Sequence, residues 1–170
     1  MSTIRNKIRG GGARPPAPPL RQVVSGLIGG GLAIGTLAAL TRSYQVPLLM
    51  APLGASCFLL FGAPDAPFAQ PRNVVFGHLL SSLVGLIFLK YIGVGPIEMG
   101  LAVGIAIALM LYTRTSHPPA GADPLVVMIA AKLSWSFLAA PVLASTVILV
   151  LIALVVNNAG KDRSWPRYWF

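Results

Sequence analysis

Acidic side chains are scarce in this sequence: among 170 residues, 4 are Asp or Glu and 13 are Lys or Arg. Asp65 and Glu98 fall in predicted loops and Asp162 in the closing tail, which leaves Asp123 as the acid of an apolar region. Cation transport usually depends on carboxylates within the membrane. The chain also lacks an HExxH metal pair, a nucleophile elbow and converging carboxylates. These absences argue against a cation transporter and an enzyme, and we expect no catalytic residue, metal or cofactor.

Cysteine and charge are also rare. The single cysteine, Cys57, excludes an internal disulfide and a metal site built from several cysteines, and a buried side chain is the expected state. Only 10% of residues are charged and 55% are hydrophobic, whereas about a quarter of residues are charged in soluble domains. We therefore predict a protein embedded in the lipid bilayer over nearly its whole length.

Apolar runs divide the chain into segments. Four runs have lengths near the ~20 residues that cross a bilayer core. Two shorter runs, 46–61 and 119–133, are interrupted by Pro and Gly and would reach about 20–25 Å as helices. These features predict an all-α, polytopic transmembrane helix bundle that contains short broken helices. The four long runs are 23–40, 74–92, 99–112 and 137–156.

Basic segments flank the apolar region. We expect residues 1–21 to form a flexible cytoplasmic arm, 22–157 the transmembrane domain, and 158–170 a cytoplasmic basic and aromatic tail. The closing sequence WPRYWF is suited to the headgroup boundary or to a neighbouring subunit. The basic ends are better explained as a signal for membrane orientation and by attraction to anionic lipid than by nucleic-acid binding. No nucleic-acid partner is therefore expected.

The distribution of Lys and Arg predicts the orientation of a six-segment topology, but it does not distinguish six crossings from four crossings with two re-entrant short segments, because both numbers are even. Of the 13 basic residues, only Arg42, Lys90 and Lys132 would lie on the side opposite the termini. Because basic loops stay on the cytoplasmic side, both termini are predicted to be cytoplasmic. The expected location is the inner (plasma) membrane of a bacterium.

The two short runs carry one pattern. PLGAS at 52–56 and PAGAD at 119–123 share P-x-G-A-[S/D], and each lies between two long runs. The chain therefore divides into two three-segment halves, 22–92 and 96–157, and the second half would enter the membrane from the opposite side. Inverted repeats with segments interrupted by Gly or Pro at matching positions indicate a transport site.

We expect the interruptions to form this site. Pro removes a backbone donor, Gly permits close approach, and the N–H groups that begin a helix attract anions. A small inorganic anion is the predicted partner, bound near the midplane chiefly by backbone at 54–56 and 121–123. The predicted binding residues are Gly54, Ala55, Ser56, Arg72, Asn73, His78, His117, Pro118, Pro119, Gly121, Ala122 and Asp123.

Several of these side chains also have structural interpretations. Ser56 and Asp123 are suited to capping the short helices that follow them, and for Asp123 this role is at least as good an interpretation as proton or ion handling. For His117, donation to an anion and a loop or cap position are equally good interpretations. Arg72 would either attract an anion at the cytoplasmic mouth or anchor the topology, and the anchoring role is favoured.

A polar stripe lies on one face of the third segment. His78 and Ser82 are one helical turn apart, and Ser81 and Gly85 fall on the same face. The stripe would line a permeation path or bond to neighbouring helices, and the second role is favoured. Small residues spaced by four, which in this segment are Gly77, Ser81 and Gly85, are assigned to helix packing. Outside this segment they are Gly26/Gly30, Gly31/Gly35 and Gly100/Gly104.

Three motifs in this order resemble the HPP family of small integral membrane proteins: MAPLGAS at 50–56, AQPRNVVFGH at 69–78 and SHPPAGADPL at 116–125. The family is named for the His-Pro-Pro found here at 117–119. Members are associated with nitrite transport in cyanobacteria and chloroplast envelopes, and the family is commonly described with four spanning segments. The resemblance therefore implies a transporter or channel for nitrite.

Two further expectations accompany this hypothesis. The alternative function is a membrane scaffold or accessory subunit without transport activity of its own. We also expect a homo-oligomer, because six short segments leave little lateral area to shield two broken helices from lipid. The Gly-rich first segment is the candidate contact face.

The topology is testable by labelling single cysteines with an impermeant reagent. A cysteine in the 90–98 loop should react from the side opposite the N-terminal arm, because three crossings would separate them. Reaction of both sites from the same side would contradict the inverted repeat.

Overall fold

The computed structural model of the chain describes residues 12–160 and 164–170. Within these residues all regular structure is helical, which confirms the all-α fold class. The α helices are α2 (Leu20–Tyr44), α3 (Ala51–Cys57), α4 (Pro71–Ile87), α5 (Pro96–Tyr112), α6 (Asp123–Ala130) and α7 (Ser145–Asn157). The 3-10 and π turns are η1 (Phe58–Gly62), η2 (Pro67–Ala69), η3 (Phe88–Ile92), η4 (Pro118–Ala122), η5 (Trp135–Leu138) and η6 (Ala139–Ala144). Residues 1–11 of the predicted arm and 161–163 of the predicted tail lie outside the description.

Three helical segments are long and apolar enough to cross a membrane: α2, α4 continued by η3, and the continuous stretch from η5 to α7. They correspond to three of the four long runs. The fourth, 99–112, belongs to the 17-residue helix α5, which is apolar but shorter. The number of complete crossings stays a prediction.

The loop assignment of Glu98 is wrong. Glu98 lies in the first turn of α5, because that helix begins at Pro96. Proline suits the first turn of a helix, where its missing N–H would have no helical partner, and an acidic side chain is favourable there. The connection between η3 and α5 is therefore only residues 93–95.

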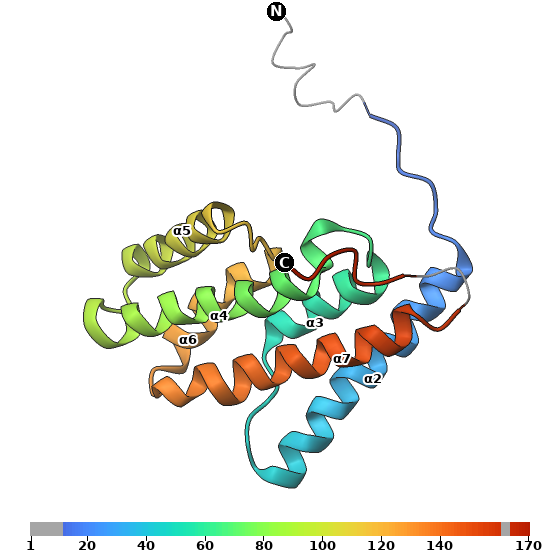
Figure 1. The fold of residues 1–170 in the computed structure, drawn as a ribbon. Helices are drawn as coiled ribbons and strands as arrows, with labels where there is room; N and C mark the ends of the chain where they lie inside the picture. Colours follow the sequence, from blue (N-terminus) through green and yellow to red (C-terminus); the bar gives the residue numbers. More distant parts are fainter. Residues whose placement is uncertain (1–11, 161–163) are drawn as a thin grey trace, which may run out of the picture.

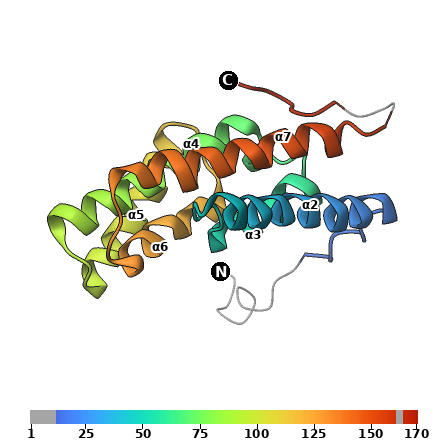
Figure 2. The ribbon, with the colours of Figure 1, turned by 90° about the horizontal axis from the view of Figure 1, so that it is seen from below.

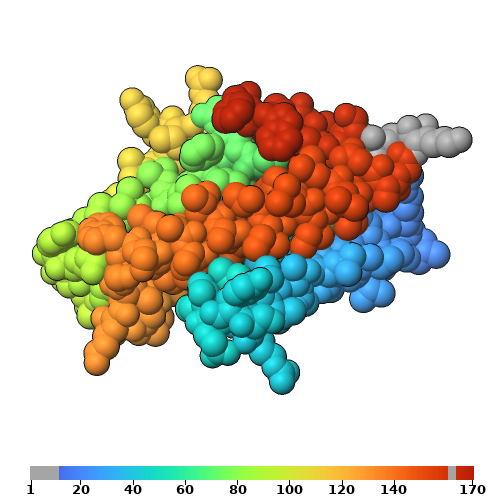
Figure 3. Space-filling view, turned by 60° about the horizontal axis from the view of Figure 1, so that its bottom comes forward, coloured from blue at the N-terminus to red at the C-terminus, as the bar shows by residue number. Residues whose placement is uncertain are grey.

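Helix α4 is central to the bundle and contacts α5, α6 and α7 (Figures 1 and 2). Helix α2 packs on α7 and on the short α3–η1 segment. In Figure 3, α7 (orange to red) forms a long ridge with α2 (blue to cyan) along one side. The main apolar core includes Leu37, Leu53, Phe61, Val74 and Leu149, each fully buried.

Hydrogen bonds gather the segments predicted to be cytoplasmic at one end of the bundle. Near the start of α2, Gln22 donates to a carbonyl of η1. Arg72 Nη2 donates to the carbonyl of Thr113 at 3.1 Å, and the backbone N–H of Arg167 donates to Gln70 Oε1 at 2.8 Å. Helices that alternate in direction along the chain would place these segments at the same end of the bundle. The orientation in the membrane and the inverted relation of the halves stay predictions.

Close packing depends on two glycines of α4. A Cβ atom at Gly77 would lie 2.8 Å from His117 Cβ, and one at Gly85 would lie 2.8 Å from Pro124 Cα. These glycines let η4 and α6 approach α4. Most of the other predicted small residues do not pack within the chain: a Cβ at Gly26, Gly31, Gly35, Gly100 or Gly104 would meet nothing within 4 Å.

Substitution of these glycines tests the packing. Gly85→Ala should lower the free energy of unfolding by roughly 1–3 kcal/mol, because the new methyl group overlaps backbone that cannot rotate away. Gly104→Ala, on the open face of α5, is the matched control and should be neutral or stabilising. Thermal unfolding of the purified protein in detergent measures both. Equal effects would contradict the assigned close approach.

Candidate functional site

A buried hydrogen-bonded network lies where the two interrupted segments meet α4. Ser56 Oγ of α3 lies 2.8 Å from His78 Nε2 of α4 and 2.8 Å from His117 Nε2. The imidazole rings are 5.0 Å apart between centroids. All three side chains are fully buried. One serine hydroxyl therefore joins the two histidines of the chain.

The network continues beyond each histidine. His78 Nδ1 lies 2.7 Å from Asp123 Oδ2, at the start of α6, and Ser82 donates to the same carboxylate oxygen at 3.2 Å. His117 Nδ1 donates to the carbonyl of Phe68 at 2.7 Å. The chain of contacts thus runs from α6 through α4 and α3 to the loop before η4. Asp123 Oδ1 is buried without a hydrogen-bond partner in the structure.

Local sequence explains how the segments present these groups. The prolines at 118 and 119 supply no backbone donor, and the chain forms the 3-10 turn η4 before α6 begins. Gly77 allows His117 to approach the backbone of α4. On the same stripe, Ser81 donates to the carbonyl of Ala120 at 2.6 Å. The favoured interpretation of the stripe, hydrogen bonding between helices, is confirmed.

The predicted helix caps are wrong. Helix α3 begins at Ala51, so Ser56 lies inside it, and its hydroxyl is 3.2 Å from the carbonyl of Pro52 one turn earlier. Asp123 is the first residue of α6 and makes no capping bond. His117 lies in the loop before η4, which agrees with the loop interpretation, and its side chain makes no capping bond. All three side chains point instead into the network.

Most of the remaining predicted residues lie on the outer face, although Pro119 is buried and Gly121 is half-buried. Gly54, Ala55, Pro118 and Ala122 are exposed. A groove of about 680 Å³ is lined by side chains of α6 together with Ala55, Pro118, Pro119 and Ala122. A Cβ at Gly54 would meet nothing within 4 Å, and one at Gly121 only Ile107 at 4.0 Å. Gly54 therefore lies outside the buried network, and the approach of an anion to its backbone stays a prediction.

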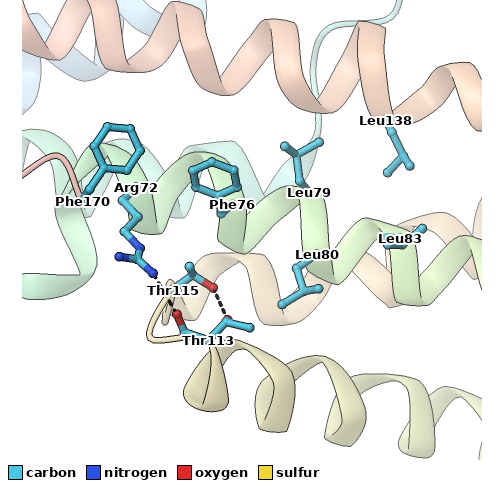
Figure 4. Close-up of a pocket in the computed structure, with 9 residues that line it drawn as sticks. All are labelled: Arg72, Phe76, Leu79, Leu80, Leu83, Thr113, Thr115, Leu138 and Phe170. Atoms are coloured by element: carbon cyan, nitrogen blue, oxygen red, sulfur yellow. Dashed lines mark hydrogen bonds between the residues drawn. The ribbon is translucent and has the colours of Figure 1, made fainter.

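Arg72 and Asn73 lie apart from the network. Arg72 lines an apolar cavity of about 580 Å³ along α4, and Figure 4 shows it beside Phe170 with its guanidinium directed toward Thr113. Asn73 donates to the carbonyl of Ser116 at 2.9 Å and accepts from Tyr168 at 2.9 Å. The predicted site thus separates into a buried network, an outer groove and this end of α4.

Two features of the network escape the sequence. The carbonyl of Phe68 is a backbone acceptor and gives no sequence signal. Ser82 belongs to the predicted stripe, but the pattern does not show which group it would meet. Within residues 12–160 and 164–170, no three His, Cys, Asp or Glu side chains cluster as a metal site.

The contribution of Asp123 to stability is testable. Asp123→Leu should cost about 3–5 kcal/mol, because the donors of His78 and Ser82 lose their buried acceptor. Asp123→Asn keeps one oxygen acceptor and should cost about 1–3 kcal/mol. The matched control is Asp65→Asn, which affects an exposed ion pair with Arg167 and should change stability by less than about 1 kcal/mol. If the leucine and asparagine variants both unfold in detergent at the temperature of the parent protein, the network does not stabilise the fold.

Comparison with known proteins places the chain in a family. Residues 15–166 match the family described as "HPP, transmembrane region". Two curated relatives from Dictyostelium discoideum, each named only as a transmembrane protein, are 35% and 34% identical over 92% and 96% of this chain. The chain spans 59% and 56% of their lengths. No solved structure matches. The chain belongs to the HPP family of transmembrane proteins.

Proposed function

We propose that the protein is a membrane transporter for a small inorganic anion, with nitrite as the first candidate. The convergence of two imidazole nitrogens on one oxygen position carries this proposal: His78 Nε2 and His117 Nε2 both lie 2.8 Å from Ser56 Oγ. An anion oxygen in place of the hydroxyl would accept from both imidazoles. Such charge-assisted bonds are about twice as strong as neutral ones.

The position of the network supports a transport role. It joins both interrupted segments to α4, and short broken segments are the usual location of transporter sites. Ionisable residues are costly within a membrane and mark pathways for ions or protons. Here His78, His117 and Asp123 are all buried and are linked through hydrogen bonds to one another and to Ser56. The anion therefore takes the side-chain network, rather than the Gly54 backbone, as its binding site.

The charge of the chain and the family resemblance favour an anionic cargo. The formal net charge is +9, and Arg72 is only half-buried at the end of α4 that also carries the tail. A basic entrance concentrates anions near the protein. The association of HPP members with nitrite transport directs the choice among small anions.

The alternative is a membrane scaffold or accessory subunit. It is favoured because the polar atoms of the network bond to one another or to nearby carbonyls, with the exception of Asp123 Oδ1. It is also favoured by the hydrogen bonds of Tyr168 and Arg167, which hold the tail against the start of α4. Under either function, we propose a homo-oligomer with both termini in the cytoplasm. The bacterial plasma membrane remains the proposed location.

Nitrite uptake into liposomes that contain only this protein tests the transport function. Uptake should exceed that of protein-free liposomes, and His117→Leu should abolish the excess because it removes one of the two donors. His117→Gln retains a donor and should keep part of the flux. Ser43→Leu, on the exposed last turn of α2, is the control for adding an apolar side chain and should leave the flux unchanged. Correctly inserted protein that moves no nitrite would favour the accessory function.

A further inference from the structure

The hydrogen bonds of the network restrict where its protons lie. A carbonyl oxygen only accepts, so His117 Nδ1 carries a proton toward Phe68. A neutral His117 then has a bare Nε2, which accepts the hydroxyl proton of Ser56. Because a hydroxyl has one proton, Ser56 must accept from His78 Nε2. His78 Nδ1 and Asp123 Oδ2 share one further proton between them.

The same heavy-atom positions accommodate one additional proton. If His117 Nε2 is also protonated, both imidazoles donate to Ser56 Oγ, and the hydroxyl turns to donate to the Pro52 carbonyl at 3.2 Å. Every N–H and O–H in this arrangement has an acceptor. With Asp123 ionised and both histidines charged, the network gains one positive charge. It can therefore gain or lose a proton without rearrangement of its side chains.

Among the described residues around the network, no other charged side chain makes a hydrogen bond to His78, His117 or Asp123. Around it, α3 contributes the neutral Ser56 and the buried thiol of Cys57, and the sequence of α7 contains no charged residue. On α4 and η3, Arg72 is bonded to Thr113, and Lys90 lies 5.7 Å from the ring centre of Trp135. Glu98 is in the first turn of α5, and the basic residues of α2, Arg21 and Arg42, lie at its two ends. The titratable groups in contact are His78, His117 and Asp123.

We propose that Ser56 relays a proton between His78 and His117, and that the network takes up one proton together with each anion. In the relay step, the proton on His78 Nε2 moves to Ser56 Oγ while the hydroxyl proton moves to His117 Nε2. His78 changes from imidazolium to neutral and His117 from neutral to imidazolium, so the total charge is unchanged. The coupling to an anion rests on the proposed transport function.

Anion binding requires the additional proton for a geometric reason. Both Nε2 atoms donate to a shared oxygen only when both are protonated, whereas the network without the additional proton leaves one of them bare. An anion that displaces the hydroxyl is therefore held by two donors only after His117 has gained its second proton. The negative charge of the anion then balances the added positive charge, and the cargo crosses without net charge.

Nitrogen NMR tests the relay without any transport measurement. The chain contains 2 histidines, so protein labelled with 15N-histidine and purified through a histidine-free tag reports only these rings. During a pH titration in lipid nanodiscs, His117 Nδ1 should stay protonated, and the Nε2 signals of both rings should change together. Ser56→Ala should abolish this coupling, so that each ring titrates as a separate site.

Ser81→Ala is the matched control. Ser81 is a fully buried serine of the same stripe, but it donates to the Ala120 carbonyl and lies outside the relay. The coupled titration should persist in this variant. Rings that titrate independently in the parent protein, with the same curves as in Ser56→Ala, would overturn the relay whether or not the protein transports nitrite.

Proton movement in liposomes tests the coupling. At alkaline pH, where passive entry of nitrous acid is small, an internal pH dye should report one proton for each nitrite that enters. The uptake rate should not respond to a membrane potential set with potassium and valinomycin. Nitrite uptake driven by the potential without proton entry would overturn the coupling and leave the transport function intact. Absence of nitrite uptake would overturn both the transport function and the coupling, while the NMR titration would still decide the relay.

Discussion

The structure depends on one constraint: polar groups buried in an apolar bundle must find partners within the protein. Ser56 meets this constraint by contacting both imidazoles at 2.8 Å. Its hydroxyl connects three separate parts of the chain, which are α3, α4 and the loop before η4. Removing it would leave two buried ring nitrogens without that shared partner, so the packing of both interrupted segments depends on this contact.

The glycines and prolines of the motifs bring this contact about. Gly77 and Gly85 let η4 and α6 reach α4, where a methyl group would overlap His117 or Pro124. The two prolines begin the 3-10 turn η4, which separates His117 from the start of α6, and both His117 and Asp123 reach α4. Between them, Pro118 and Ala122 are exposed and line the groove with α3, whereas Ala120 is buried and its carbonyl accepts from Ser81. Each interrupted segment therefore has an inner polar face and an outer apolar face.

Sequence reasoning recovers the parts of this design that follow from periodicity. Three long apolar runs match the long helices, and the spacing of His78 and Ser82 predicts one helical face. It fails at Ser56, because α3 begins at Ala51 rather than after Ser56, so that the hydroxyl faces the two imidazoles instead of a helix end. It cannot identify the Phe68 carbonyl, since a backbone acceptor has no residue-specific signal. The outward position of Gly54 likewise depends on tertiary packing.

A double-mutant cycle between Ser56→Ala and Asp123→Asn tests the central claim, which is that one network joins the two interrupted segments. These side chains do not bond to each other but share His78 as a partner. Their effects on the free energy of unfolding in detergent should therefore differ from additivity by about 0.5–3 kcal/mol. The cycle of Ser56→Ala with the exposed Asp65→Asn should be additive. Additivity within about 0.3 kcal/mol for the Ser56 and Asp123 pair as well would contradict a shared network.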